Sequence, residues 1–157
     1  MATFTHLHTH SHFSFGSGVS SPAVLLEAAR ARGFTALACT DTNGVYGAIE
    51  FQQAAESMGI RPILGAHLVA NGQEAVALAA DEQGWAALCR AITAIHWTTE
   101  PIHLAGLLAP DRRGLILLSN SLAFLEQVRD LSGPADLYAE LRPGKERHAV
   151  LAAARRL

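Results

Sequence analysis

The order of apolar and polar positions along the chain predicts short strands alternating with amphipathic helices. Ser21-Pro22 is typical of a helix start, with serine as the N-cap and proline at the first helical position, and Gly33 is typical of a helix end. Residues 96–113 contain two prolines and no steady period, so we predict that they are irregular. The predicted helices span residues 22–33, 46–58, 83–95, 122–131 and 145–157, and the predicted strands span residues 3–7, 36–40, 62–69, 75–80, 115–118 and 136–141.

Strands that alternate with helices predict an α/β fold with a mostly parallel sheet, either open or closed into a barrel. Asn71-Gly72 is a strong signal for one hairpin. A complete barrel of eight strand–helix units takes about 250 residues. The chain has 157 residues, and its pattern ends on a helix with no strand after it. We therefore favour one domain, residues 1–157, that forms the front portion of a longer barrel.

Composition excludes several classes of protein. Half of the residues are hydrophobic and 17% are charged, which excludes a disordered chain. The net charge of −2 argues against a surface that holds nucleic acid by charge alone. No apolar run reaches the roughly 18 residues of a membrane span, and the amino terminus does not resemble a secretory signal. Cys39 and Cys89 form no scaffold pattern, so we expect two reduced thiols in a cytoplasmic protein.

Histidine is the candidate for chemistry, because four of the eight histidines stand at alternate positions: His6, His8, His10 and His12. On an extended backbone they share one face, where imidazoles bind Zn, Mn, Fe and similar ions. The ligands must be neutral, so such a site should weaken below about pH 6. The alternatives are a polar segment with histidines by chance and a purification tag, and the interleaved residues count against the tag.

Further ligands are expected where neighbouring strands end, because parallel α/β folds collect their chemistry at the carboxyl ends of strands. Asp41 follows the predicted strand 36–40 and breaks it, and His67 lies near the end of strand 62–69. Alone, Asp41 could be a turn residue and His67 a core histidine. Together with His8 and His10, they form a candidate site for a transition metal.

Three stretches carry a resemblance to a known family: HLHTHSHFSFGSG (6–18), ALACTDTNGVYGAIEF (36–51) and IRPILGAHL (60–68). They resemble the polymerase-and-histidinol-phosphatase (PHP) superfamily, in particular the N-terminal PHP domain of bacterial C-family DNA polymerases, the polymerase III alpha and error-prone types. The resemblance implies a distorted (β/α)7 barrel with up to three Zn, Mn or Fe ions. It also implies phosphoester hydrolysis in active members, 3′–5′ exonuclease activity in some polymerase domains, and a scaffolding role in others. The His-x-His pair of the family falls on His8 and His10.

The chain departs from the family pattern at several ligand positions. Neutral residues replace carboxylates: Ser17 stands before Gly18 where the family has Asp, and His67 stands where the third strand has Glu. Thr42 follows Asp41 where the family has His, Ser119-Asn120-Ser121 replaces a stretch with Cys, and the terminal Asp-x-His pair would lie beyond Leu157. Bridging carboxylates hold adjacent cations together. We therefore expect one ion on His8, His10 and His67, with Asp41, His6 and His12 as supporting residues or further ligands.

Two functions remain open at this point. The first is a degenerate, non-catalytic PHP module of a polymerase III alpha or error-prone polymerase-like protein, which serves DNA replication or repair by docking other polypeptide. The second is a metal-dependent phosphoesterase or 3′–5′ exonuclease that uses the histidines. Nucleic-acid binding is a weaker hypothesis, because the basic residues of 142–156 also suit a solvated helix face. An incomplete barrel would expose a sheet edge, so we expect self-association or a polypeptide partner, and no membrane.

Overall fold

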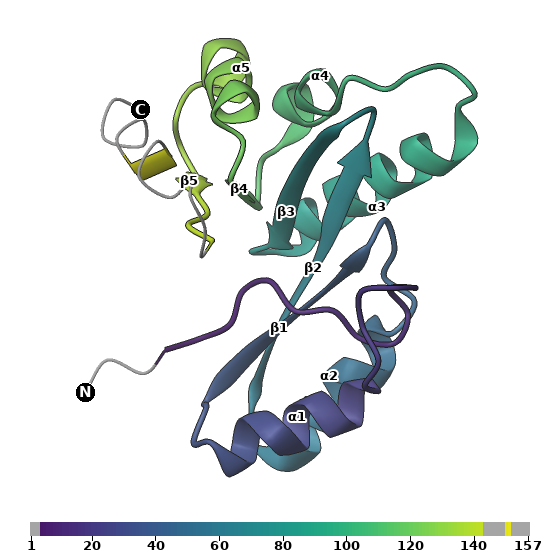
Figure 1. Ribbon diagram of the computed structural model, residues 1–157, viewed down its shortest axis with the longest axis vertical. Coiled ribbons are helices and arrows are strands. Elements are labelled where there is room, and N and C mark those ends of the chain that lie inside the picture. Colours follow the sequence, from purple (N-terminus) through teal and green to yellow (C-terminus); the bar gives the residue numbers. More distant parts are fainter. Residues whose placement is uncertain (1–3, 143–149, 152–157) are drawn as a thin grey trace. The chain divides into compact units, whose positions relative to one another are not determined.

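The computed structural model of the chain describes residues 4–142 and 150–151 (Figure 1). The polypeptide forms two compact units, Met1–His67 and Leu68–Leu157. It is a mixed α/β fold whose five strands follow one another in the sheet in chain order, β1-β2-β3-β4-β5. Every helix in the described part of the chain is too short or too polar to span a bilayer.

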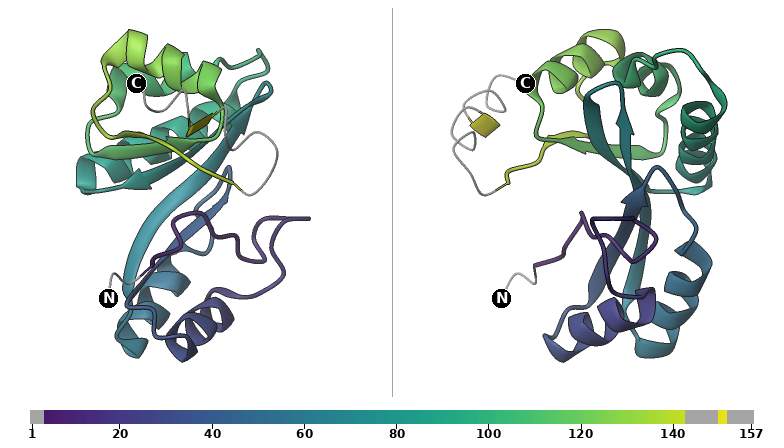
Figure 2. Two further views of the ribbon diagram at one scale, coloured as in Figure 1. Left: turned by 60° about the vertical axis from the view of Figure 1, so that its left-hand side comes forward. Right: turned by 45° about the vertical axis from the view of Figure 1, so that its right-hand side comes forward.

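The first unit consists of two helices packed on two parallel strands. Its elements are α1 (Pro22–Ala31), β1 (Ala36–Thr42), α2 (Ala48–Met58) and the greater part of β2 (Arg61–Ala70). Strands β1 and β2 are parallel, with Ala36 opposite Arg61 and Thr42 opposite His67. Figures 1 and 2 show α1 and α2 side by side along this pair of strands. The core between them contains Leu26, Ala29, Leu37, Cys39, Phe51, Ala55 and Ile60.

The second unit begins with the end of β2 and its hairpin. Its further elements are β3 (Gln73–Ala79), α3 (Glu82–Trp97), α4 (Leu104–Leu108), the 3-10 turn η1 (Ala109–Asp111), β4 (Leu115–Ser119), α5 (Leu122–Ser132) and β5 (Leu137–Ala139). Strand β3 runs antiparallel to β4, and β4 runs parallel to β5. Helix α3 packs against β3 and β4, and α5 packs against α4 and β5 (Figure 2).

Local signals in the sequence explain where several elements begin and end. The Ser21 hydroxyl accepts a hydrogen bond from the Val24 amide, and α1 then begins at Pro22. Helix α2 is followed by Gly59 in the left-handed conformation. Asn71 and Gly72 both have positive φ, 47° and 74°, as a two-residue hairpin turn requires. The predicted hairpin is therefore confirmed.

Two predicted features at the amino-terminal side are wrong. Residues 4–7 form no strand, and Thr3 lies outside the described residues. The segment bends at residues 7 and 8 instead, so its side chains do not alternate regularly between two faces. Asp41 does not break the strand either, because β1 continues through Thr42. Pairing with β2 extends β1 up to Thr42, which a local reading of the turn-forming residues cannot detect.

The prediction that residues 96–113 are irregular holds for residues 98–103 and 112–113 and is wrong for the rest. Helix α3 continues to Trp97, and the short helix α4 and the turn η1 follow. Their apolar residues are buried, which shows that tertiary packing stabilises helical turns too short to be read from a period: Leu104, Ala105, Leu108 and Ala109. The predicted helix 145–157 lies outside the described residues except for positions 150 and 151, which are helical.

Candidate metal centre

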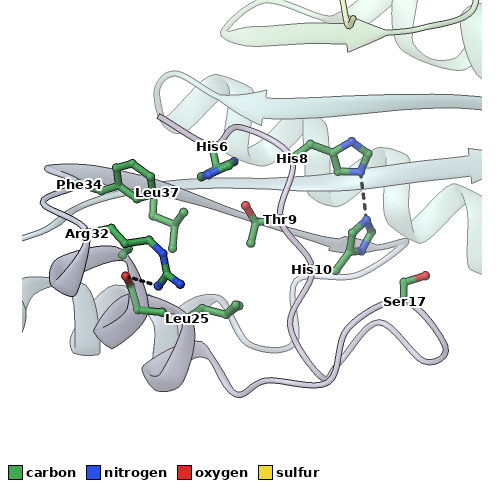
Figure 3. Close-up of a pocket in the computed structure, with 11 residues that line it drawn as sticks. His6, His8, Thr9, His10, Ser17, Leu25, Arg32, Phe34 and Leu37 are labelled. Carbon is green, nitrogen blue, oxygen red and sulfur yellow. Dashed lines mark hydrogen bonds between the residues drawn. The ribbon is translucent and has the colours of Figure 1, made fainter. Parts of the chain in front are cut away.

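Three histidines of the first unit converge on one point. One ring nitrogen each of His8, His10 and His67 lies within 4.8 Å of the other two. Nε2 of His8 is 3.0 Å from Nε2 of His10, the contact drawn as a dashed line in Figure 3. The ring centroid of His67 is 4.6 Å from that of His8 and 5.3 Å from that of His10. Each of the three residues is half-buried.

The parallel pair of strands explains this convergence. His67 lies opposite Thr42, the last residue of β1, so it stands where the parallel pairing ends. Backbone hydrogen bonds hold the amino-terminal segment on β1, from the Ala38 amide to the His6 carbonyl (3.0 Å) and from the Thr40 amide to the Thr9 carbonyl (2.9 Å). The histidines that follow are thereby carried to the carboxyl end of the strand, as the sequence predicts.

Asp41 is not part of the histidine group. Its side chain is buried, 2% exposed, and its carboxylate accepts hydrogen bonds from the Ser11 amide (2.7 Å) and the Ser11 hydroxyl (2.7 Å). The Ser14 hydroxyl donates to the same carboxylate at 2.6 Å, and the Cys39 thiol lies 3.5 Å from it. These hydrogen bonds hold the loop after His10 on β1, so the Asp41 carboxylate supports the site without being one of its candidate ligands.

Burial and the neighbouring Asp41 carboxylate both raise the pKa of the Cys39 thiol. Removal of the Cys39 thiol from water raises its pKa far above the ordinary value of a thiol, and the nearby Asp41 carboxylate raises this pKa further. Cys39 is therefore a protonated thiol across the neutral range, which makes it a core residue rather than a metal ligand or nucleophile.

The other two candidate histidines lie outside the group. His6 is exposed, and its ring makes edge contacts with the rings of Phe4 and Phe34 at centroid distances of 4.8 and 5.3 Å. His12 is exposed and packs on the ring of Phe13. The bend at residues 7 and 8 and the turn that begins at His12 remove the regular alternation on which their prediction rested.

The three imidazoles fit one transition-metal ion. Two nitrogen ligands of a tetrahedral Zn²⁺ at about 2.0–2.1 Å lie roughly 3.3–3.4 Å apart. The 3.0 Å between the two Nε2 atoms is close to that separation, and small ring movements would bring His67 into it. Among the described residues, no Asp or Glu joins these three side chains in a potential metal group. The donor set is therefore neutral and suits one ion rather than a cluster.

A cavity of about 390 Å³ opens beside His8 and His10 (Figure 3). Apolar residues of α1 and β1 line it, among them Leu25, Ala29 and Leu37. Arg32 also lines it, and its guanidinium donates to the carbonyl oxygen of Ala28 at 3.0 Å. The cavity gives solvent and solutes a route to the histidines from the side of α1.

Sequence reasoning did not single out Ser14, although this residue links the group to Asp41. The Ser14 hydroxyl lies 2.9 Å from Nδ1 of His10 and also accepts from the Thr42 amide at 3.0 Å. One serine among several in a polar stretch carries no local signal. Only the long-range contacts with Thr42 and Asp41 distinguish it.

Residues 6–156 match the family model of the PHP domain, and the chain belongs to this family. Its curated relatives include proteins named error-prone DNA polymerase. The relative from Symbiobacterium thermophilum is 37% identical over 170 residues, which cover 91% of this chain and 16% of the relative. The relative from Mycobacterium tuberculosis strain H37Rv is 36% identical over 104 residues, 59% of this chain and 10% of the relative. The chain thus corresponds to a small part of these polymerases.

Solved structures show the same fold at low sequence identity. A protein from Bifidobacterium adolescentis, assigned as a metal-dependent phosphoesterase, superposes with a TM-score of 0.64 at 17% sequence identity. The superposition covers 99% of this chain and 84% of the Bifidobacterium chain. An amidohydrolase from Chromobacterium violaceum, with bound sulfate and no metal, also has a TM-score of 0.64 at 17% identity, with coverages of 97% and 82%. These likenesses confirm the predicted mixed α/β class.

Proposed function

We propose that this chain is the PHP domain of an error-prone DNA polymerase-like protein and that it binds one transition-metal ion through His8, His10 and His67. The convergence of three ring nitrogens within 4.8 Å carries the proposal. The kinship with error-prone DNA polymerases and the fold of a protein assigned as metal-dependent support it. Zn, Mn and Fe are the ions that imidazole ligands suit.

In this proposal the domain is a non-catalytic module that serves DNA replication or repair by docking other polypeptide. A bound ion polarises phosphoryl oxygens and lowers the pKa of bound water, but efficient phosphodiester hydrolysis uses adjacent metals bridged by carboxylates. Ser17 and His67 supply no carboxylate, and the Asp41 carboxylate is occupied by Ser11 and Ser14. The ion then stabilises the amino-terminal segment on β1.

One observation favours a second candidate, a metal-dependent phosphoesterase or 3′–5′ exonuclease. Three protein ligands leave a coordination position open, which is typical of catalytic rather than structural zinc sites. The cavity that His8 and His10 line provides access to that position. Hydrolysis by a single ion would be slow, because no carboxylate among the described residues joins the group as a general base.

The test compares ligand variants with a matched control in the same segment. We expect one ion per chain in the native protein. His8→Ala and His67→Ala should weaken Zn²⁺ and Mn²⁺ binding by more than the roughly 10–100-fold that loss of a supporting contact costs. His12→Ala, which removes an exposed histidine outside the group, should leave the affinity unchanged. Metal binding that survives both ligand variants would contradict the proposed site.

The same proteins separate the two functions. Each is assayed on bis(4-nitrophenyl) phosphate and on a single-stranded oligonucleotide with Mn²⁺ or Zn²⁺. The non-catalytic function predicts bound metal without turnover. Turnover that disappears in His8→Ala and persists in His12→Ala would establish the phosphoesterase instead.

A further inference from the structure

Ser14 occupies a position from which its hydroxyl contacts both the metal site and the buried carboxylate. The side chain is 1% exposed, and its Oγ meets three polar groups. These are the Asp41 carboxylate at 2.6 Å, the Thr42 amide at 3.0 Å and Nδ1 of His10 at 2.9 Å. With solvent excluded, these contacts determine where the hydroxyl proton lies.

The protons of this cluster can be assigned one by one. A carboxylate only accepts, so the single proton of the Ser14 hydroxyl is donated to Asp41. A backbone amide only donates, so the Thr42 N–H uses one lone pair of Oγ. The contact with His10 then requires a donor on the histidine side, so Nδ1 of His10 carries the proton. The Thr42 hydroxyl, 3.4 Å from the same Nδ1, is a more distant second acceptor for it. Neutral imidazole has one ring proton, and Nε2 of His10 is therefore the lone-pair nitrogen.

We propose that Ser14 is a positioning residue that sets the tautomer of His10 and directs its Nε2 lone pair toward the metal position. Asp41 acts through Ser14, because the hydroxyl can accept from His10 only while it donates to the carboxylate. With this tautomer of His10, the 3.0 Å contact between the two Nε2 atoms requires His8 to be the donor. His10 thus already has the tautomer for binding, and His8 is the residue that must change. The role of Ser14 in metal binding rests on the proposed metal site, whereas the tautomer of His10 follows from the hydrogen bonds.

The first experiment measures the tautomer directly. The full chain is labelled with ¹⁵N-histidine and its long-range ¹H–¹⁵N correlations are recorded without metal. The native protein should show His10 with Nδ1 protonated and Nε2 non-protonated. Ser14→Ala should shift the His10 pattern toward the Nε2-protonated form that free imidazole side chains favour. A native His10 with its proton on Nε2 would overturn the assignment.

Ser11→Ala is the matched control for the metal measurement. It removes the other hydroxyl that donates to Asp41, at 2.7 Å, and leaves His10 untouched. Ser14→Ala should lower Zn²⁺ affinity about 10–100-fold, and Ser11→Ala, which can act only through the loop, should lower it clearly less. Equal losses in the two variants would mean that Ser14 acts only through the stability of the loop.

A third variant keeps the test decisive if Ser14→Ala unfolds. Ser14→Cys keeps the shape of the side chain with a somewhat larger atom and replaces the hydroxyl by a poor acceptor, so it should show the same change of tautomer. Failure of the metal site is distinguishable from failure of this inference. A native chain that binds no Zn²⁺ contradicts the proposed function, while the metal-free spectrum still decides whether Ser14 sets the tautomer of His10.

Discussion

At the scale of single residues, the amino-terminal site depends on how one buried carboxylate is satisfied. An ionised side chain removed from water is costly unless donors surround it. Asp41 receives an amide, two hydroxyls and a thiol, and three of these four donors come from Ser11 and Ser14, at least 27 positions earlier in the chain. The carboxylate therefore orders the loop that follows His10, although Asp41 does not join the histidine group.

Cys39 provides a test of this buried environment. Burial and the neighbouring Asp41 raise the pKa of its thiol far above the ordinary value, so the reactive thiolate is scarce in the folded protein. In a Cys89→Ala variant at pH 8, iodoacetamide should modify Cys39 many times more slowly in the folded chain than in urea, as measured by mass spectrometry. Equal alkylation rates in the folded and unfolded chain would contradict the buried, protonated thiol.

The raised pKa of Cys39 also makes the stability of the fold depend on pH in a defined direction. The unfolded thiol ionises near pH 9 and the folded thiol does not, so the contribution of Cys39 to stability is complete below that pH and decreases as the pH rises above it. The melting temperature of the native chain, measured relative to that of Cys39→Ala, should therefore fall as the pH rises above that value.

At the scale of elements, the loop between the amino-terminal segment and α1 is closed by its own backbone. The Ser14 amide donates to the Ser11 carbonyl at 3.0 Å, and the Gly18 amide donates to the Ser14 carbonyl at 3.0 Å. A Cβ at Gly18 would lie 1.9 Å from the Ser11 carbonyl oxygen. Glycine is therefore needed here because another backbone passes too close for any side chain.

Gly18→Ala should destabilise the protein by about 1–3 kcal/mol or more, because the Ser11 backbone must move to admit the methyl group. It should also weaken Zn²⁺ binding, since Ser11 and Ser14 belong to the same loop. Gly16→Ala is the control in this loop: its φ of 78° disfavours alanine, but a Cβ there meets nothing within 4 Å. That variant should cost about 1 kcal/mol in urea unfolding and leave metal affinity unchanged. Similar metal affinities in both variants would argue against the coupling of loop and site.

At the scale of the whole molecule, the chain divides its roles between two units. All three candidate ligands lie in Met1–His67, whereas Leu68–Leu157 contributes none of them. Each unit also presents large apolar side chains to solvent. Phe15 and Val19 of the first unit are 98% and 95% exposed, and Trp97 of the second unit is 87% exposed. Exposed apolar side chains mark a surface that meets other polypeptide when they form a contiguous patch.

We expect the isolated chain to self-associate or to require a polypeptide partner. Sedimentation velocity at micromolar concentrations should show a concentration-dependent average mass, because buried apolar area favours association. Phe15→Ser combined with Trp97→Ser should reduce that dependence, and a double substitution at exposed polar sites, Glu27→Ser with Glu56→Ser, is the control. A clean monomer with one cooperative melting transition would contradict the expectation.

Most elements of this protein can be predicted from its sequence, because their signals are local. Ser21-Pro22, the apolar run before Asp41 and Asn71-Gly72 each act through neighbouring residues, and the helix start, strand and hairpin are all observed. The meeting of His8 and His10 with His67 was also predictable, since the carboxyl ends of parallel strands lie together. Their role as metal ligands stays a prediction.

Other features depend on residues that are distant in the chain. The helical turns within 96–113 are stabilised by burial, and Asp41 is engaged by Ser11 and Ser14. Burial creates these effects, because it forces each buried polar group to find a partner wherever the fold brings one. A local pattern contains no information about which partner that is.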